Sequence, residues 1–255
     1  MRLFVSAGVC VWVLLLAAGC GSPPEPAATA PAVTENPVDP ATAGSIAGRI
    51  VLEGSPPAAE PINMASDPYC ESQGGGTNGE YTTGAGGTLG NVFVYVKDGL
   101  GDLKFPVPAA PAVLDQKGCL YLPRVLGLQV GQTLEIRNSD STLHNMHAIP
   151  ENNQEFNKAL SLQGLNHTHT FSTAEVMVPF KCDVHRWMRS YVGVLPHPFF
   201  AVTRADGTFQ LTGLPPGTYT VEAWHEKLPV QTQTVTIAEK ETKQVSFTFK
   251  AVAGS

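Results

Sequence analysis

The stretch Val178-Pro-Phe-Lys-Cys182-Asp-Val-His185-Arg-Trp-Met188 holds the most informative residues of this 255-residue chain. Residues 176, 178 and 180 are apolar and alternate with residues 177, 179 and 181, which predicts a strand whose inward face ends at Cys182. His185 and Met188 follow at three-residue intervals, close enough for a tight loop to bring both side chains to one point. The stretch therefore predicts a strand and a loop on which three side chains with metal-binding atoms converge.

A second segment lies upstream and reads Gln132-Thr-Leu-Glu-Ile-Arg-Asn138-Ser-Asp-Ser-Thr-Leu-His144-Asn145-Met-His147. Its first half alternates apolar and charged residues, which predicts a half-buried strand. The strand runs into a polar turn and then into His144. This histidine is the candidate fourth ligand.

One thiolate, two imidazoles and a weak thioether are the ligands of a trigonal copper site used for electron transfer. Thiolate and thioether suit Cu(I), whereas imidazole suits both oxidation states. Structural zinc sites usually use more cysteines and no methionine, and the Cys-x-x-Cys-His motif for haem attachment is absent from the sequence. The sequence predicts one type 1 copper site.

Residues 111–196 resemble the cupredoxin family, and its amicyanin-type members most closely, on the Cys-x-x-His-x-x-Met spacing, the Leu128–Asn138 strand and the His-Asn pair. The resemblance implies a Greek-key β-sandwich with copper held by His144, Cys182, His185 and Met188. Asn145 would tie the two ligand loops together by hydrogen bonds.

The sequence departs from the amicyanin pattern at Arg186, where a proline is usual. The family exposes the histidine that precedes this position, so we expect His185 at the surface. Arg186 and Trp187 are then candidate docking residues for a redox partner protein, and the alternative for Trp187 is that its ring fills the core.

The C-terminal part contains Asp206-Gly-Thr-Phe and Leu214-Pro-Pro-Gly-Thr-Tyr219, which resemble the carboxypeptidase regulatory-like (transthyretin-like) β-sandwich. That family also has strands like residues 44–54 and 91–96, which here precede the copper segment. We therefore expect one sandwich built from 44–110 and 197–250, with a cupredoxin domain, 111–196, inserted between its strands. The alternative is three consecutive units. Either arrangement is all-β.

Residues 1–20 combine Arg2, an apolar run and small residues before Cys20, which is typical of a bacterial lipoprotein signal with lipid on that cysteine. The alternatives are an ordinary signal cut near Ala18 or an uncleaved anchor helix. Residues 21–43 are rich in Pro and Ala and predict an extended linker. We expect an exported lipoprotein that faces the periplasm or the cell surface, on the outer membrane where the organism has one.

Cys70 and Cys119 are the two cysteines left after the signal, the lipidation site and the copper motif each take one. Export favours a disulfide between them. The alternative is two isolated buried thiols.

The net charge of −6 and the lack of a basic run argue against nucleic acid as a partner. The leading hypothesis is an electron carrier that serves redox proteins from a membrane anchor. Copper storage, delivery or sensing is an alternative, as is a cell-surface interaction module with a structural metal. We expect no enzyme activity, because multicopper oxidases flank the cysteine with histidines, whereas Lys181 and Asp183 stand here.

Overall fold

The structure is a computed structural model that describes residues 35–251. The predicted signal sequence, the predicted lipidation site Cys20 and residues 21–34 of the predicted linker lie outside the described residues. Residues 35–251 form sixteen strands and one short helix, which confirms the all-β expectation. Nothing helical in this range has the length and apolar character that a membrane span requires.

The first and last parts of the described chain build one two-sheet unit, here called the flanking sandwich. Its three-stranded sheet has the order β13-β1-β16, and its four-stranded sheet has the order β12-β2-β14-β15. The strands are β1 (Gly44–Glu53), β2 (Phe93–Asp98), β12 (Phe200–Val202), β13 (Thr208–Leu214), β14 (Gly217–His225), β15 (Leu228–Ile237) and β16 (Thr242–Lys250).

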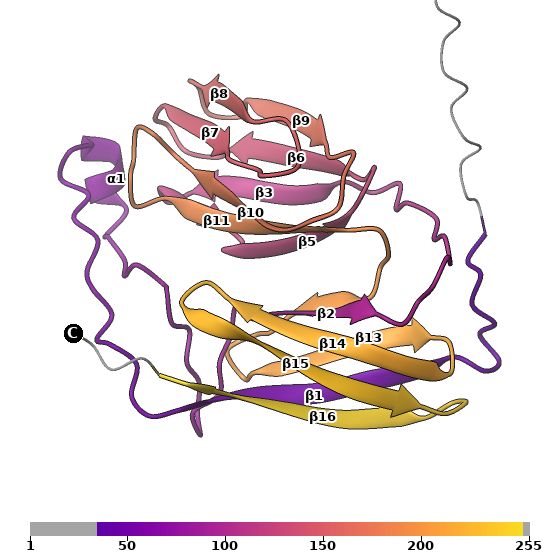
Figure 1. Ribbon diagram of the computed structural model, residues 1–255. Coiled ribbons are helices and arrows are strands. Elements are labelled where there is room, and N and C mark those ends of the chain that lie inside the picture. Colours follow the sequence, from indigo (N-terminus) through magenta and orange to yellow (C-terminus); the bar gives the residue numbers. More distant parts are fainter. Residues whose placement is uncertain (1–34, 252–255) are drawn as a thin grey trace, which may run out of the picture. The chain divides into compact units, whose positions relative to one another are not determined.

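Both N-terminal strands of the flanking sandwich lie between C-terminal strands. β1 pairs antiparallel with β13 and parallel with β16, beside which it lies in Figure 1. β2 pairs antiparallel with β12 and with β14. This is the arrangement that the insertion hypothesis requires, because neither sheet is complete without residues from both sides of the inserted segment.

The chain between β2 and β12 forms a second two-sheet unit, here called the inserted sandwich. Its sheets have the orders β5-β11-β10-β7-β8 and β4-β3-β6-β9, with β5 parallel to β11 and β3 parallel to β6. The strands are β3 (Ala112–Lys117), β4 (Leu120–Leu122), β5 (Val125–Gln129), β6 (Thr133–Asn138), β7 (His144–Ala148), β8 (Phe156–Leu160), β9 (Asn166–Thr170), β10 (Glu175–Lys181) and β11 (Arg189–Leu195).

Strand β10 carries the predicted alternation only from Val178 onward. The pairing of β10 with β11 shifts register between Glu175 and Val178, and Met177 adopts a φ of 67°. As a result Met177 is buried and Val176 is 38% exposed, so the expectation that Val176 faces inward is wrong. Beyond this β-bulge the alternation holds, and it directs Phe180 and Cys182 into the core.

The two sandwiches share a hydrophobic contact. Phe93 and Tyr95 on β2 belong to a cluster that includes Val125 of the inserted sandwich, whereas Val94 and Val96 lie in the core of the flanking sandwich. A β-carbon on Gly193 of β11 would lie 2.5 Å from the Phe93 ring. Only glycine therefore allows this close approach.

Residues 62–72 leave the flanking sandwich and pack on the inserted one. Helix α1 (Pro68–Ser72) begins after the N-cap Asp67, and Met64 and Cys70 are buried in the core cluster of the inserted sandwich. Cys70 forms a disulfide with Cys119. The expectation that 44–110 lies wholly within the flanking sandwich is therefore wrong for this segment, which we call the cover.

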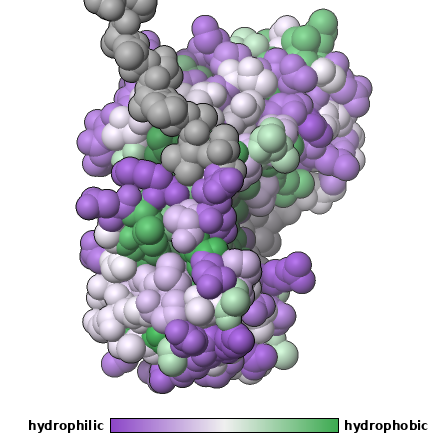
Figure 2. Space-filling model, turned by 90° about the vertical axis from the view of Figure 1, so that its right-hand side faces the viewer, coloured by the Kyte–Doolittle hydropathy of each residue, from purple (hydrophilic) through white to green (hydrophobic). Residues whose placement is uncertain are grey.

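The surface in Figure 2 is mostly hydrophilic, with hydrophobic side chains gathered in small patches. Scattered exposed apolar residues are ordinary on a folded domain. The candidate metal ligands are instead buried, with His185 beneath the cover.

Candidate metal centre

Neighbouring strands and one tight loop bring the candidate ligands together. β7 begins at His144 and pairs antiparallel with β10, after which Cys182 follows directly. His185 and Met188 lie in the loop that leads from β10 to β11. All four side chains are buried, and no residue of the four is more than 1% exposed.

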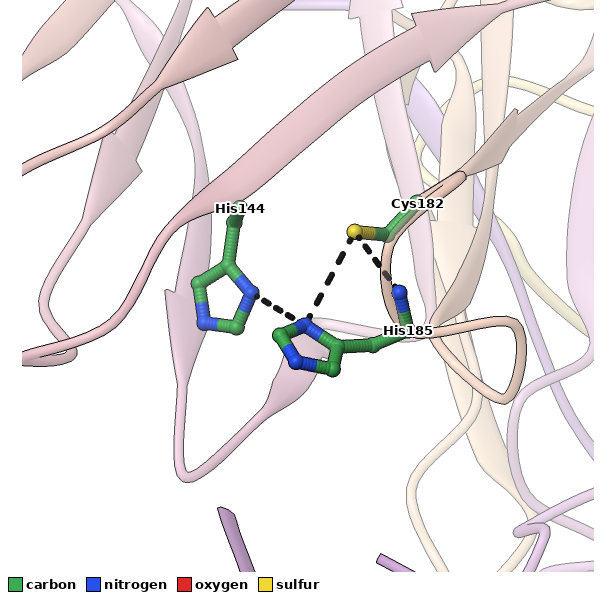
Figure 3. Close-up of side chains that lie close together, drawn as sticks. All are labelled: His144, Cys182 and His185. Carbon is green, nitrogen blue, oxygen red and sulfur yellow. Dashed lines mark hydrogen bonds between the residues drawn. The ribbon is translucent and has the colours of Figure 1, made fainter. Parts of the chain in front are cut away.

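The three strongest donors converge (Figure 3). The Nδ1 atoms of His144 and His185 lie 2.9 Å apart, and the Sγ of Cys182 lies 4.0 Å from the Nδ1 of His185. Ligand atoms of all three residues lie within 4.8 Å of one another. Bonds from a first-row metal to nitrogen and sulfur are about 2.0–2.3 Å long. The donors are thus close enough to bind one ion.

A carboxylate lies against the outer nitrogen of each imidazole. The Nε2 of His144 is 2.9 Å from Asp140 Oδ2, and the Nε2 of His185 is 3.1 Å from Asp67 Oδ2. A histidine that donates its outer N–H in this way presents the lone pair of its other nitrogen to a metal. The two Nδ1 atoms lie 2.9 Å apart, so without a metal they share a proton in a hydrogen bond. A bound cation would take the place of that proton, so the arrangement fits a metal ion.

The surroundings of the Cys182 thiol favour its ionised form. Burial raises its pKa, but hydrogen bonds from His144, His185 and the backbone outweigh burial and lower the pKa to about 6. One of these bonds runs from the His185 amide to Sγ over 3.3 Å. At neutral pH the sulfur is therefore mostly thiolate, the form that binds metals.

Asp140 and His144 polarise each other. Burial lowers the pKa of His144, but the bonds to Asp140 and Cys182 raise it overall. Burial raises the pKa of Asp140, but bonds from His144 and from the amides of Gly118 and Cys119 lower it overall. The charged form of Asp140 is therefore favoured beside the imidazole.

The ligand loop closes through its own backbone. The Cys182 amide donates to the Met188 carbonyl over 3.2 Å, and the Met188 amide donates to the His185 carbonyl over 2.9 Å. Met188 is fully buried in the same core cluster as Cys182. These bonds close the loop with Arg186 in place of the usual proline.

Asn145 links the two segments that carry the ligands. Its Oδ1 accepts the amide of Asp183 over 2.6 Å, and its Nδ2 donates to an Asp183 carboxylate oxygen over 3.1 Å. His147 and Asn157 also bond to that carboxylate oxygen. Burial raises the pKa of Asp183, but bonds from Lys181 and these partners hold it well below its usual range.

The two candidate docking residues differ in their exposure to solvent. Arg186 is exposed, whereas Trp187 is half-buried with its ring 5.0 Å from that of His185. The Trp187 Nε1 donates to the Cys119 carbonyl over 2.9 Å. Trp187 thus packs between a candidate ligand and the disulfide.

The expectation that His185 is exposed is wrong. The side chain is covered by Asp67 and by Cys70, whose Sγ lies 3.6 Å from Nε2. The resemblance spans only 111–196, so it carried no information about a cover from residues 62–72.

Two functional candidates, Asp67 and Asp140, escaped the sequence reasoning. Asp140 lies in the polar turn four residues before His144, and its position in that turn was the available signal. Asp67 precedes Pro68, a sign of a helix start, but nothing in the sequence indicates its contact with His185. Two further groups of potential ligands in residues 35–251 contain Cys70 or Cys119, whose disulfide removes them as thiolate donors.

Comparison with family models identifies one region of the chain. Residues 196–250 match the family model of the carboxypeptidase regulatory-like domain. Among curated proteins, none matches the chain.

Several solved structures resemble part of the chain. A copper-containing nitrite reductase from Thermus scotoductus SA-01 is 22% identical, with a TM-score of 0.33 over 38% of this chain and 24% of that one. A purple cupredoxin from Nitrosopumilus maritimus is 26% identical, with a TM-score of 0.28 over 32% of this chain and 98% of that one. A mutant of amicyanin in its Cu(I) form is 20% identical, with a TM-score of 0.30 over 40% and 97%.

The chain spans about a quarter of the length of the nitrite reductase. With TM-scores near 0.3, the assignment of the inserted sandwich comes from its strand order and its buried donor set rather than from these similarities. Residues 196–250 are thus similar to the carboxypeptidase regulatory-like domain, and the inserted sandwich holds the buried donor set that the sequence predicts.

Proposed function

We propose that this protein is an exported, membrane-tethered type 1 copper protein that passes single electrons, with copper held by His144, Cys182, His185 and Met188. The observation that carries the proposal is the convergence of two imidazole Nδ1 atoms on a low-pKa thiolate, with both outer ring nitrogens held by carboxylates. A thiolate, two imidazoles and a weak thioether suit copper in either oxidation state.

Burial of the donors supports electron transfer over copper delivery. Delivery needs a route by which a ligand of the acceptor reaches the metal. The cover lies on His185 and is held by a disulfide, while His144 is fully buried. An electron crosses such a barrier without any exchange of ligands, so the burial of both imidazoles favours a carrier over a copper donor.

A carrier is also proposed in preference to an enzyme. Lys181 and Asp183 flank Cys182, and neither supplies the additional imidazole donors that a second copper centre beside the cysteine would use. The Asp183 carboxylate is engaged with Asn145, Asn157 and His147. The residues next to the thiolate thus serve to hold the loops.

The test is copper loading of the protein purified without its signal sequence. The Cu(II) form should be intensely coloured, because the Cys182 thiolate donates charge to copper. Cys182→Ser should abolish the colour, and a voltammogram of the wild type should show one reversible one-electron couple. A colourless wild type that binds Zn(II) tightly would contradict the proposal.

The membrane tether is a separate proposal that rests on the signal-like sequence before Cys20. Cys20→Ala should move the protein from the membrane fraction to the soluble fraction, or stall its processing. Unchanged fractionation would remove the lipid anchor and leave the copper proposal intact.

A further inference from the structure

The imidazole that the family exposes is not available for contact with a partner in this chain. His185 is 1% exposed, its Nε2 is bonded to Asp67, and its ring packs on Trp187. The Trp187 indole is in turn bonded to the Cys119 carbonyl. A redox partner that approached the cover would therefore meet α1 and the disulfide rather than a copper ligand.

Another copper ligand does reach a pocket. A pocket of about 290 Å³ is lined by Lys181, Cys182, Asp183, Arg186 and Arg189. Cys182 is itself a candidate ligand, so this pocket has the metal's thiolate residue in its wall.

The wall of this pocket is positively charged. Lys181 pairs with Asp183 over 3.1 Å, so these two charges largely cancel. Arg186 and Arg189 are exposed, and neither forms an ion pair with any residue in 35–251. Two uncompensated guanidinium groups therefore stand beside Cys182 in a chain whose net charge is −6.

We propose that Arg186 and Arg189 form the docking surface for a one-electron redox protein with an acidic face, and that electrons enter and leave beside Cys182. This inference rests on the proposed copper function. One electron passes between the site and the partner, so that one is oxidised as the other is reduced, and no bond is formed or broken. Complementary charge raises the rate of encounter and orients the partner over the thiolate.

The test uses two small redox reagents of opposite charge on the reduced, copper-loaded protein. Hexacyanoferrate(III) is an anion and mimics an acidic partner, whereas tris(phenanthroline)cobalt(III) is a cation. Stopped-flow absorbance follows the return of the copper–thiolate colour. The variant is Arg186→Glu/Arg189→Glu, and the matched control is Arg49→Glu, an exposed arginine on β1 in the flanking sandwich.

At low ionic strength the double variant should lose about tenfold or more of the hexacyanoferrate rate and should react faster with the cobalt complex, with both effects fading at high salt. The control should stay within about twofold of wild type with both reagents. Rates that move in the same direction with both reagents indicate a changed driving force and overturn the inference, as do rates within about twofold of wild type.

Poly(glutamate) extends the test to a macromolecular acidic surface. It should slow the hexacyanoferrate reaction of the wild type and of Arg49→Glu but not that of the double variant; equal inhibition of all three overturns the inference. A wild type with a normal colour and a reversible couple but no charge dependence refutes only the docking surface. A wild type without that colour or couple refutes the proposed function itself.

Discussion

Asp67 hydrogen-bonds both to the helix of the cover and to the candidate ligand His185, so its removal should be measurable in stability. One carboxylate oxygen accepts the amides of Tyr69 and Cys70 over 2.8 and 3.1 Å, which caps α1. The other accepts from the Thr142 hydroxyl over 2.7 Å and lies 3.1 Å from His185 Nε2. The two oxygens thus hold the helix and the inserted sandwich together.

The pKa of Asp67 gives the size of its contribution to the free energy of unfolding. Burial raises it, but the bonds from Thr142, the Cys70 amide and His185 lower it from 3.8 to about 2. At about 1.4 kcal/mol per pH unit, this corresponds to about 2.5 kcal/mol in favour of the folded, charged form. Because 19% of the side chain is exposed, screening by solvent reduces the contribution to about 1–2 kcal/mol.

Two substitutions separate the cap from the charge. Asp67→Asn keeps a good N-cap residue and should lower the free energy of unfolding by about 1–2 kcal/mol at pH 7. Asp67→Ala loses the cap as well and should cost about 1 kcal/mol more. The measurement is urea unfolding of the metal-free, disulfide-bonded protein. Asp102→Asn is the control and should leave the unfolding curve unchanged, because Asp102 is an exposed residue in the loop after β2.

The pH dependence of the stability difference between wild type and Asp67→Asn provides a result that could refute this account. The pKa of Asp67 is lower in the folded chain than its ordinary 3.8, so its contribution is present above that pH and is lost as the pH falls towards about 2. The difference between wild type and Asp67→Asn should vanish across this window. Equal stability of the two proteins at pH 7, or a difference that persists undiminished at the acid end, would refute this account of the cover.

Three further predictions concern the metal ligands and the disulfide. Met188→Leu should keep copper and colour but raise the midpoint potential, because a weak donor to Cu(II) is lost. The control Met146→Leu, equally buried in the same core, should leave the potential unchanged. Loss of copper from Met188→Leu would mean that the role of the loop has been misread. In the metal-free protein, ultraviolet titration of the thiolate should give Cys182 a pKa of about 6, with copper affinity falling below that pH as protons compete for sulfur; a midpoint near 9 would contradict the bonds to the two histidines. The disulfide closes a loop between two residues that are 49 positions apart, so its removal in Cys70→Ser/Cys119→Ser should lower the free energy of unfolding by about 4 kcal/mol, measured by urea unfolding. A loss below about 1 kcal/mol would mean that packing alone holds the cover.

The ligand set could be predicted because its chemistry is rare and local. Cys182, His185 and Met188 stand within seven residues of one another, and His144 follows a strand that the alternation of polar and apolar residues predicts. The pairing of β1 with C-terminal strands was also predictable, since the motifs of one sandwich stand on both sides of the copper segment.

What could not be predicted depends on contacts between distant residues. Asp67 and His185 are 118 residues apart, and the cover around Asp67 shows no periodic pattern that would place it on the inserted sandwich. The bulge at Met177 arises from a change of register with β11, which no alternation in β10 alone reveals. Tertiary pairing overrides the local pattern at both places.

The cover and the pocket together explain how one site can be closed to ligands and open to electrons. The anionic groups Asp67 and Asp140 bond to the outer nitrogens of the two imidazoles, where they fix the rings and favour a cation between them. The free cations Arg186 and Arg189 lie beside Cys182, in the wall of the pocket. In the proposed copper protein, negative charge would therefore act on the metal, while positive charge would act on whatever approaches the thiolate. A partner drawn by the arginines would meet the thiolate residue, and the covered imidazole side would keep the metal in place while the electron passes.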